Sequence, residues 1–308
     1  MSDSSVPPAN AISQTAAGSS RQSTGVPGLD ELLGGGLIPG TLTVVVGSSG
    51  IGKTQFGLHF LEAGRRQEGR RGVIFDMSAR IDPQSHAEYA QRMFDWSPRE
   101  HAEARFDPTE YFAPDRIPGE YLHVFERAGR RVTQREMGFD GWHDWQAQLA
   151  ARLEITIDFF YGNFVRGARR AVVDGIEPAE RPSESIQHEL FEYVYHQVLR
   201  KESSWVARDL FRQSFRAHAS SIEANAYDHR QVGAMLLVTA RETMLEPLVE
   251  RPLADGDVLA TANTLIYLGK LREGLRTSRA MYIAKHRGSA CTDDIVRYTI
   301  DDRGLRVG

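Results

Sequence analysis

From Thr41 onward, short apolar runs alternate with longer amphipathic segments in which apolar residues recur near helical spacing. Each run is expected to form a buried strand, and each amphipathic segment the helix that follows it. The four strand–helix units are TLTVVV with residues 55–66, GVIFDM with 83–94, YLHVF with 142–164, and AVVD with 186–200. This alternation predicts an α/β fold, with a mostly parallel central sheet that carries helices on both faces.

The pattern changes toward the C-terminus. AMLLVTA continues the series of buried strands, whereas TLIYLGKL, SRAMYIAKH and VRYTID follow one another without amphipathic helices between them. We expect these last segments to form an antiparallel extension at one edge of the sheet.

Residues 1–22 are rich in Ser, Ala, Pro and Gln, which predicts a disordered N-terminal tail ahead of a single domain over residues 23–308. Two segments interrupt the alternation and are expected to be insertions. Residues 106–141 show no clear periodicity. Residues 202–230 place apolar side chains near helical spacing with arginines between them, which favours an amphipathic helix packed on the core over a nucleic-acid or partner surface.

Composition narrows the class of protein. The chain has 308 residues, is 41% hydrophobic, and carries 37 basic and 41 acidic side chains, so its formal net charge of −4 gives no overall attraction to nucleic acid or anionic membranes. The single cysteine, Cys291, excludes an internal disulfide and fits a reducing compartment. The N-terminus lacks a signal-peptide pattern, and no apolar run reaches membrane-spanning length. We therefore expect a cytoplasmic protein without membrane contacts.

The turn between the first predicted strand and helix carries the strongest motif. Gly47-x-x-x-x-Gly52-Lys53-Thr54 is the pattern of a phosphate-binding loop, in which glycines let successive backbone N–H groups turn toward one anion. Lys53 is expected to neutralise the β- and γ-phosphates, and the Thr54 hydroxyl to hold Mg²⁺. The predicted nucleotide-binding residues are Gly47, Ser48, Ser49, Gly50, Ile51, Gly52, Lys53 and Thr54.

Such a loop needs an acidic residue at the end of another buried strand. Asp174 follows the apolar residues of ARRAVVD, and the carboxyl edge of a parallel sheet is where ligands bind. Asp174 is therefore predicted to organise the metal together with Thr54.

Beyond these residues, the chain resembles the KaiC group of RecA-like ATPases. STGVPGLDELLGGGLIPGTLTVVVGSSGIGKTQFGLHFL is similar to the entry segment of a KaiC domain, and ARRAVVDG, HELF, LLVTARE and REGLRTSRAMYIAKHRGS follow in the family's order. The resemblance covers about residues 23–307 apart from the two insertions. It implies one RecA-like domain that binds ATP and Mg²⁺.

The resemblance also implies a homo-oligomeric ring, commonly a hexamer, with ATP between neighbouring subunits. Lys285-His286-Arg287-Gly288 resembles the segment that reaches a neighbour's γ-phosphate, which makes Lys285 and Arg287 candidates for a catalytic role. On a strand, these two cations share one face while His286 points away. Without the resemblance, an edge strand with solvated charges would be the simpler interpretation.

The chain departs from the family at one catalytic position. KaiC relatives carry a pair of glutamates after their second strand, whereas an alignment without gaps places Ser78 and Ala79 there. Asp82 and Glu177 are the remaining candidates for orienting the attacking water. Because such a group contributes about 10²- to 10⁴-fold in rate, slow ATP hydrolysis is expected. Nucleotide binding with almost no turnover is the alternative.

Three functions remain open at this stage. The first is a nucleotide-dependent ring with a signalling or regulatory role. The second is a DNA-handling ATPase akin to recombinases or helicases, which the negative net charge disfavours. The third is a nucleotide-loaded scaffold for a regulatory protein partner, held through the aromatic segment 106–145.

Overall fold

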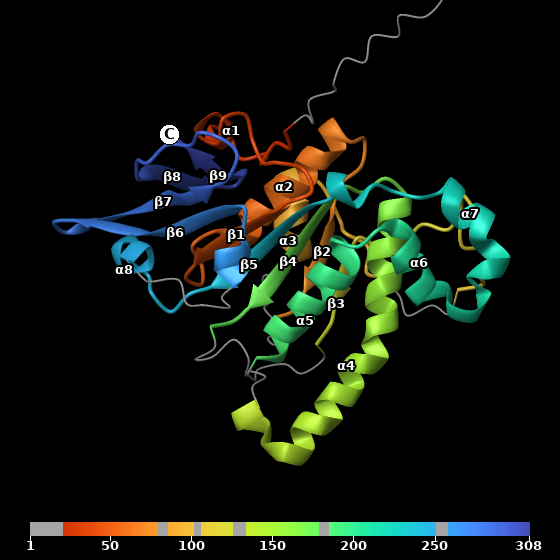
Figure 1. Cartoon of the computed structure of the whole chain (residues 1–308). Coiled ribbons are helices and arrows are strands. Elements are labelled where there is room, and N and C mark those ends of the chain that lie inside the picture. The colour runs from red at the N-terminus through yellow and green to blue at the C-terminus, as the bar shows by residue number, and fades with distance from the viewer. Residues whose placement is uncertain (1–20, 79–85, 102–105, 126–133, 179–184, 251–257) are drawn as a thin grey trace, which may run out of the picture.

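The computed structural model describes residues 21–78, 86–101, 106–125, 134–178, 185–250 and 258–308. The strands are β1 (Leu42–Gly47), β2 (Val73–Asp76), β3 (Tyr121–His123), β4 (Arg170–Ile176), β5 (Gly233–Thr239), β6 (Thr264–Glu273), β7 (Arg276–His286), β8 (Val296–Asp301) and β9 (Gly304–Val307). They form a nine-stranded sheet in the order β3-β2-β4-β5-β1-β6-β7-β8-β9 (Figure 1).

The sheet has a parallel part and an antiparallel part. Every pairing from β3 to β6 is parallel, and the pairings β6–β7, β7–β8 and β8–β9 are antiparallel. The predicted α/β fold with an antiparallel edge extension is confirmed. Sequence patterning missed β9, which is four residues long and follows β8 through a tight turn.

The helices are α1 (Leu29–Leu32), α2 (Lys53–Gln67), α3 (His86–Phe94), α4 (Gln134–Val165), α5 (Ile186–Val194), α6 (Ser203–Phe211), α7 (Ala219–Ala224), α8 (Leu245–Glu250) and α9 (Val258–Thr261). A π-helix, Tyr195–Leu199, continues α5, and short 3₁₀ helices cover Arg212–Ser214, Arg216–His218 and His229–Gln231. Within the described part of the chain, no helix is both long and apolar enough to cross a bilayer.

Helices cover both faces of the sheet because the strand side chains alternate between two apolar clusters. Val45 of β1 packs in the cluster that contains Phe56 of α2, and this cluster also includes residues of α3, β8 and β9. Its neighbour Val44 belongs to the opposite cluster, with Phe160 of α4 and Phe191 of α5. The parallel strands are thus buried on both sides, as their continuous apolar runs predict.

The two predicted insertions contain regular structure. Residues 106–141 include β3 and the beginning of α4, which starts at Gln134 rather than near Trp142. Residues 202–230 include α6 and α7, whose buried apolar residues are Val206, Leu210, Phe211 and Ile222. The second segment therefore packs on the core as an amphipathic element, although Trp205 is 47% exposed.

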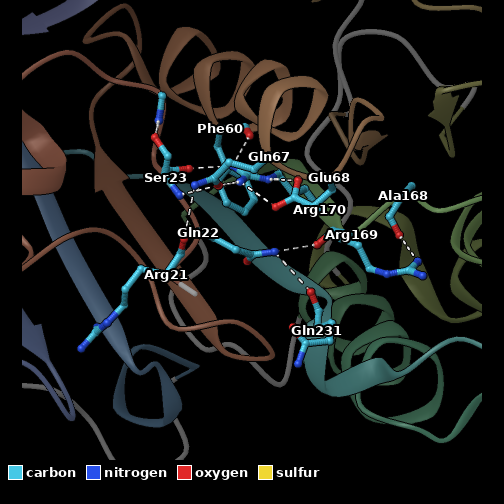
Figure 2. Close-up of polar contacts among 11 residues, drawn as sticks. Arg21, Gln22, Ser23, Phe60, Gln67, Glu68, Ala168, Arg169, Arg170 and Gln231 are labelled. Carbon is cyan, nitrogen blue, oxygen red and sulfur yellow. Dashed lines mark hydrogen bonds and ion pairs between the residues drawn. The ribbon is translucent and has the colours of Figure 1, made fainter. Parts of the chain in front are cut away.

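The N-terminal segment around Gln22 is hydrogen-bonded to the edge of the sheet at which the parallel strands begin. Gln22, the last residue of the predicted tail, exchanges backbone hydrogen bonds with Leu37 at 2.8 and 2.7 Å. Its side-chain amide donates to the carbonyls of Arg169 at 3.1 Å and Gln231 at 3.2 Å (Figure 2). Gln22 is 4% exposed and so belongs to the fold.

Arg170, at the start of β4, is the centre of this attachment. Its side chain is fully buried and forms a bidentate ion pair with Glu68, in which Nε lies 2.8 Å from Oε2 and Nη2 lies 2.9 Å from Oε1 (Figure 2). It also donates to the carbonyls of Ser23 at 2.6 Å and Phe60 at 2.8 Å, and its guanidinium lies over the Phe60 ring. One buried cation thereby links the N-terminal segment, α2 and β4.

We expect Arg170→Ala to lower the free energy of unfolding by about 3 to 5 kcal/mol, because Glu68 and two carbonyls lose a buried partner. Arg169→Ala is the matched control. Among the described residues, the Arg169 side chain donates only to the nearby carbonyls of Phe164 and Ala168, so about 1 kcal/mol is expected. Urea denaturation measures both, and equal losses in the two variants would contradict the central role of Arg170.

Candidate nucleotide-binding site

The turn between β1 and α2 has the backbone that the glycine motif predicts. Gly47 ends β1, and α2 begins at Lys53. Gly50 and Gly52 have φ of 73° and 110°, in the left-handed region that favours glycine. A Cβ on Gly47 would lie 2.6 Å from the Leu268 carbonyl oxygen. The loop therefore requires glycine for its conformation at two positions and for close packing at a third.

The C-terminal strands β8 and β9 pack against this loop. The Tyr298 hydroxyl of β8 donates to the Ile51 carbonyl at 2.8 Å. A Cβ on Gly52 would lie 2.6 Å from Leu305 Cδ1 of β9 and 2.7 Å from Ile300 Cδ1 of β8. The β8–β9 hairpin thus fixes the loop on the side away from its open end, where Ser49 and Gly50 are exposed.

Lys53 and Thr54 occupy the first turn of α2. The Lys53 ammonium is buried and donates to the Ser48 carbonyl at 2.9 Å, inside the loop itself. Burial lowers the pKa of Lys53, an effect that the negative charge of Asp174 partly opposes. The Thr54 hydroxyl donates to Asp174 Oδ2 at 2.7 Å. The two parts of the site predicted from separate motifs, the loop and the acidic residue of β4, therefore meet.

Asp174 has an acidic neighbour on the adjacent strand. Asp76 of β2 and Asp174 of β4 are direct partners in the parallel register, so both face the α2 and α3 side of the sheet. His86, the first residue of α3, lies between them, with Nε2 3.0 Å from Asp174 Oδ2 and Nδ1 3.5 Å from Asp76 Oδ2. The Tyr121 hydroxyl of β3 donates to Asp76 Oδ2 at 2.7 Å.

These contacts set the charge of Asp174. Burial alone would raise its pKa, but the hydrogen bond and charge of His86, the Thr54 hydroxyl and the Lys53 ammonium outweigh burial and lower the pKa. An ionised carboxylate beside a threonine hydroxyl is a donor pair that Mg²⁺ accepts in nucleotide sites. Thr54 and Asp174 therefore fit the metal predicted for them.

The water-orienting residue remains a prediction. Asp82 and Ala79 lie outside the described residues. Ser78, the other residue at the family's glutamate positions, donates its backbone N–H to Asp76 at 2.9 Å. Glu177 directly follows β4, and its backbone N–H donates to the side chain of Gln187 at 3.1 Å. This places Glu177 at the same carboxyl edge of the sheet as Asp174.

Lys285 and Arg287 lie away from the loop of their own chain. Lys285 of β7 pairs with Leu265 of β6. Gly47 of the loop pairs with Leu268 of β6, three residues further along that strand. At the spacing of a sheet, this separation is about 10 Å along the strands and about 10 Å across them. Lys285 Nζ donates to the Ala260 carbonyl at 2.7 Å, and the Arg287 backbone N–H donates to Asn263 at 2.9 Å. These two cations are therefore not part of the Lys53 site within one chain.

The histidine between them points the other way. His286 is buried, with Nδ1 2.9 Å from the Thr264 hydroxyl and Nε2 3.1 Å from the Leu33 carbonyl. Arg287 is exposed, and Lys285 is half-buried. Burial, followed by the charge of Arg287, lowers the pKa of Lys285. Two like charges at this surface create a position suited to an anion from outside the chain.

Sequence patterning missed two side chains of the site, His86 and Tyr121. Neither residue belongs to a recognisable sequence motif. Both reach the site because α3 and β3 lie next to the strands that carry Asp76 and Asp174. Their place follows only from the register that pairs Asp76 with Asp174 and Tyr121 with Ile74.

Residues 22–104 match the family model described as "ATPase: KaiC". This range contains the whole phosphate-binding loop and β2, the strand that carries Asp76. Over these residues, the chain is similar to the KaiC ATPases.

The chain is also similar, over short stretches, to curated proteins. It is 46% identical over 59 residues to the circadian clock protein KaiC2 of Synechocystis sp., which covers 18% of this chain and 10% of that protein. It is 37% identical over 76 residues to the circadian clock oscillator protein KaiC of Rippkaea orientalis, which covers 25% of this chain and 13% of that protein. The matches thus span only about a tenth of the relatives' length.

One solved structure is similar over most of both chains. The crystal structure of a KaiC-like protein from Pyrococcus horikoshii aligns with 94% of this chain and 98% of its own, with a TM-score of 0.48 and 17% identity.

We expect Asp174→Asn to weaken ATP binding by about tenfold or more when Mg²⁺ is present and to change it little in EDTA, because the lost charge acts through the metal. The control is Asp209→Asn, which removes a 41%-exposed carboxylate of α6. Isothermal titration with ATP in the two buffers measures the difference. Equal weakening with and without Mg²⁺ would contradict a metal role for Asp174.

Proposed function

We propose that this KaiC-like chain binds Mg·ATP in the Gly47–Thr54 loop and hydrolyses it slowly within a homo-oligomeric ring that has a signalling or regulatory role. The observation that carries the proposal is the contact between the Thr54 hydroxyl and Asp174, next to a left-handed glycine loop that ends in Lys53.

ATP binding would use donors that the loop already presents. Lys53 would exchange the Ser48 carbonyl for phosphate oxygens, which are stronger acceptors because they are charged. Thr54 and Asp174 would hold Mg²⁺, which neutralises charge on the β- and γ-phosphates. The start of α2 adds the partial positive charge of a helix N-terminus at the same point.

Slow ATP hydrolysis is expected from the residues at the position of the family's catalytic glutamate. The family's glutamate is replaced by Ser78 or Ala79. Glu177 and Asp82 remain candidates for orienting water, and Asp76 is already engaged by Tyr121 and Ser78. We expect a rate about 10²- to 10⁴-fold below that of an enzyme with a positioned base.

The ring is proposed from the position of Lys285 and Arg287. Both lie too far from their own loop to touch its nucleotide, and Arg287 is exposed. In a ring, this surface would meet the phosphates bound by the next subunit, as in the family segment that KHRG resembles. The signalling role rests on the same resemblance and on relatives that are named as circadian clock proteins.

A subunit-mixing experiment tests hydrolysis and the ring together. Lys53→Ala should lose ATP binding, and Arg287→Ala should bind ATP but lose at least about tenfold in phosphate release, because a charge at the γ-phosphate is removed. In a 1:1 mixture, the sites of Arg287→Ala subunits that face an intact Arg287 should work. Recovery of about a quarter of the wild-type rate is expected from random mixing in a ring.

Three results bear on separate parts of the proposal. No recovery on mixing would contradict catalysis by the neighbouring subunit. Wild-type phosphate release no faster than that of Lys53→Ala would remove the enzyme and favour a nucleotide-binding scaffold. Unchanged mass by light scattering with ATP, ADP or no nucleotide would contradict nucleotide-dependent assembly.

A further inference from the structure

A polar hollow lies at the opposite end of the sheet from the phosphate-binding loop. It has a volume of about 600 Å³ and lies between the end of α2, the turn before β4 and the segment before β3. Its lining includes four arginines and two glutamates: Arg65, Arg70, Arg71, Arg166, Glu68 and Glu120. This size is typical of a small-molecule site.

The carboxylates around the hollow already have cationic partners. Glu68 is held by the buried Arg170 through both of its oxygens (Figure 2). Glu120 accepts from the Arg99 guanidinium at 3.1 Å and from the Arg99 backbone N–H at 3.0 Å. Glu62, just outside the hollow, accepts from Arg71. The negative charge on the wall is therefore neutralised.

Arg70 and Arg166 are left in excess. Arg70 donates one NH1 bond to the Arg166 carbonyl at 3.1 Å, and no carboxylate within the described residues forms an ion pair with it. The Arg166 side chain donates to the carbonyls of Ala113 at 2.6 Å, Tyr111 at 3.3 Å and Phe112 at 3.5 Å. The Nε of Arg166 is buried without a partner among the residues described. Within the part of the chain that the structure describes, the Arg70 guanidinium therefore donates only to the Arg166 carbonyl, and its other N–H groups have no partner there.

Burial and neighbouring cations make the positive charges of Arg70 and Arg166 unfavourable when no anion is bound. Burial lowers the pKa of Arg70, and the charges of Arg166 and Arg99 add to this effect against the opposing influence of Glu120. Burial likewise lowers the pKa of Arg166, with a further contribution from Arg116. A bound anion would offset both the desolvation and the repulsion between the guanidinium groups.

Two glycines, Gly69 and Gly167, also line the hollow. Gly69 and Gly167 have φ of 77° and 96°, and a Cβ added to either would meet nothing within 4 Å. The Arg71 guanidinium lies 5.3 Å from the centroid of the buried Trp96 ring, so this cation is held in place. Planar guanidinium groups recognise phosphate oxygens in pairs.

We propose that this hollow binds a small anion with two or more phosphate groups, at a site separate from the phosphate-binding loop. Arg70 is the main contact, and Arg166 supplies further positive charge that no carboxylate among the described residues pairs with. Because Glu68 is shared with Arg170, the bound anion would lie next to the attachment of the N-terminal segment.

Titration with inorganic pyrophosphate tests the site. The full-length chain is first saturated with Mg·ATP, so that the loop is occupied, and binding of pyrophosphate is followed by calorimetry. We expect saturable binding that Arg70→Ala weakens by about tenfold or more, because a charge-assisted pair of hydrogen bonds is lost. Arg66→Ala is the matched control, since Arg66 is exposed near the end of the same helix and does not line the hollow. It should change the affinity by less than about twofold.

Two further variants keep the test decisive. Arg70→Lys retains the charge but loses the planar fork, so its affinity should fall between those of the wild type and Arg70→Ala, and it serves alone if Arg70→Ala does not fold. Lys53→Ala should lose ATP but still bind pyrophosphate in the hollow, which separates this site from the proposed function. Absence of saturable binding, or equal weakening by Arg66→Ala and the Arg70 variants, would overturn the proposal.

Discussion

The hydrogen bond from the Thr54 hydroxyl to Asp174 connects the first turn of α2, which follows β1, to β4. The two strands are not neighbours in the sheet, because β5 lies between β1 and β4. The hydrogen bond requires the glycine loop to turn tightly enough that α2 starts directly above the sheet. It also requires β4 to end at the level of the loop. Both conditions bring a hydroxyl and an ionised carboxylate together at the positive end of a helix, which is the environment that a magnesium-bound triphosphate needs.

The rest of the fold maintains this geometry from two sides. The β8–β9 hairpin packs under the loop through Tyr298, Leu305 and Ile300. At the other end of the sheet, Arg170 ties the start of β4 to α2 and to the N-terminal segment. The antiparallel extension and the buried arginine thus both serve the position of the loop relative to β4.

Much of this arrangement could be predicted from local sequence patterns. The strands of the parallel sheet are continuous apolar runs, and the loop and Asp174 each stand where a strand ends, so motif and hydrophobic pattern agree. The grouping of Asp76, His86 and Tyr121 could not be predicted, because it depends on the register of three strands and the start of a helix. The isolation of Lys285 and Arg287 from their own loop likewise follows from the β6–β7 register. Arg170 is missed for another reason: a charged residue at the start of a strand usually lies in solvent, and only the tertiary fold shows that it is buried.

The proposed function depends on the binding of a magnesium-bound nucleotide by the Gly47–Thr54 loop. The most direct measurement is the affinity of the purified chain for ATP and GTP by calorimetry, with Mg²⁺ and with EDTA, in the wild type and in Thr54→Val. We expect saturable binding with one nucleotide per chain, strengthened by Mg²⁺ in the wild type and much less so in Thr54→Val. No Mg²⁺-dependent affinity for either nucleotide, or the same Mg²⁺ dependence in both proteins, would contradict this mode of binding.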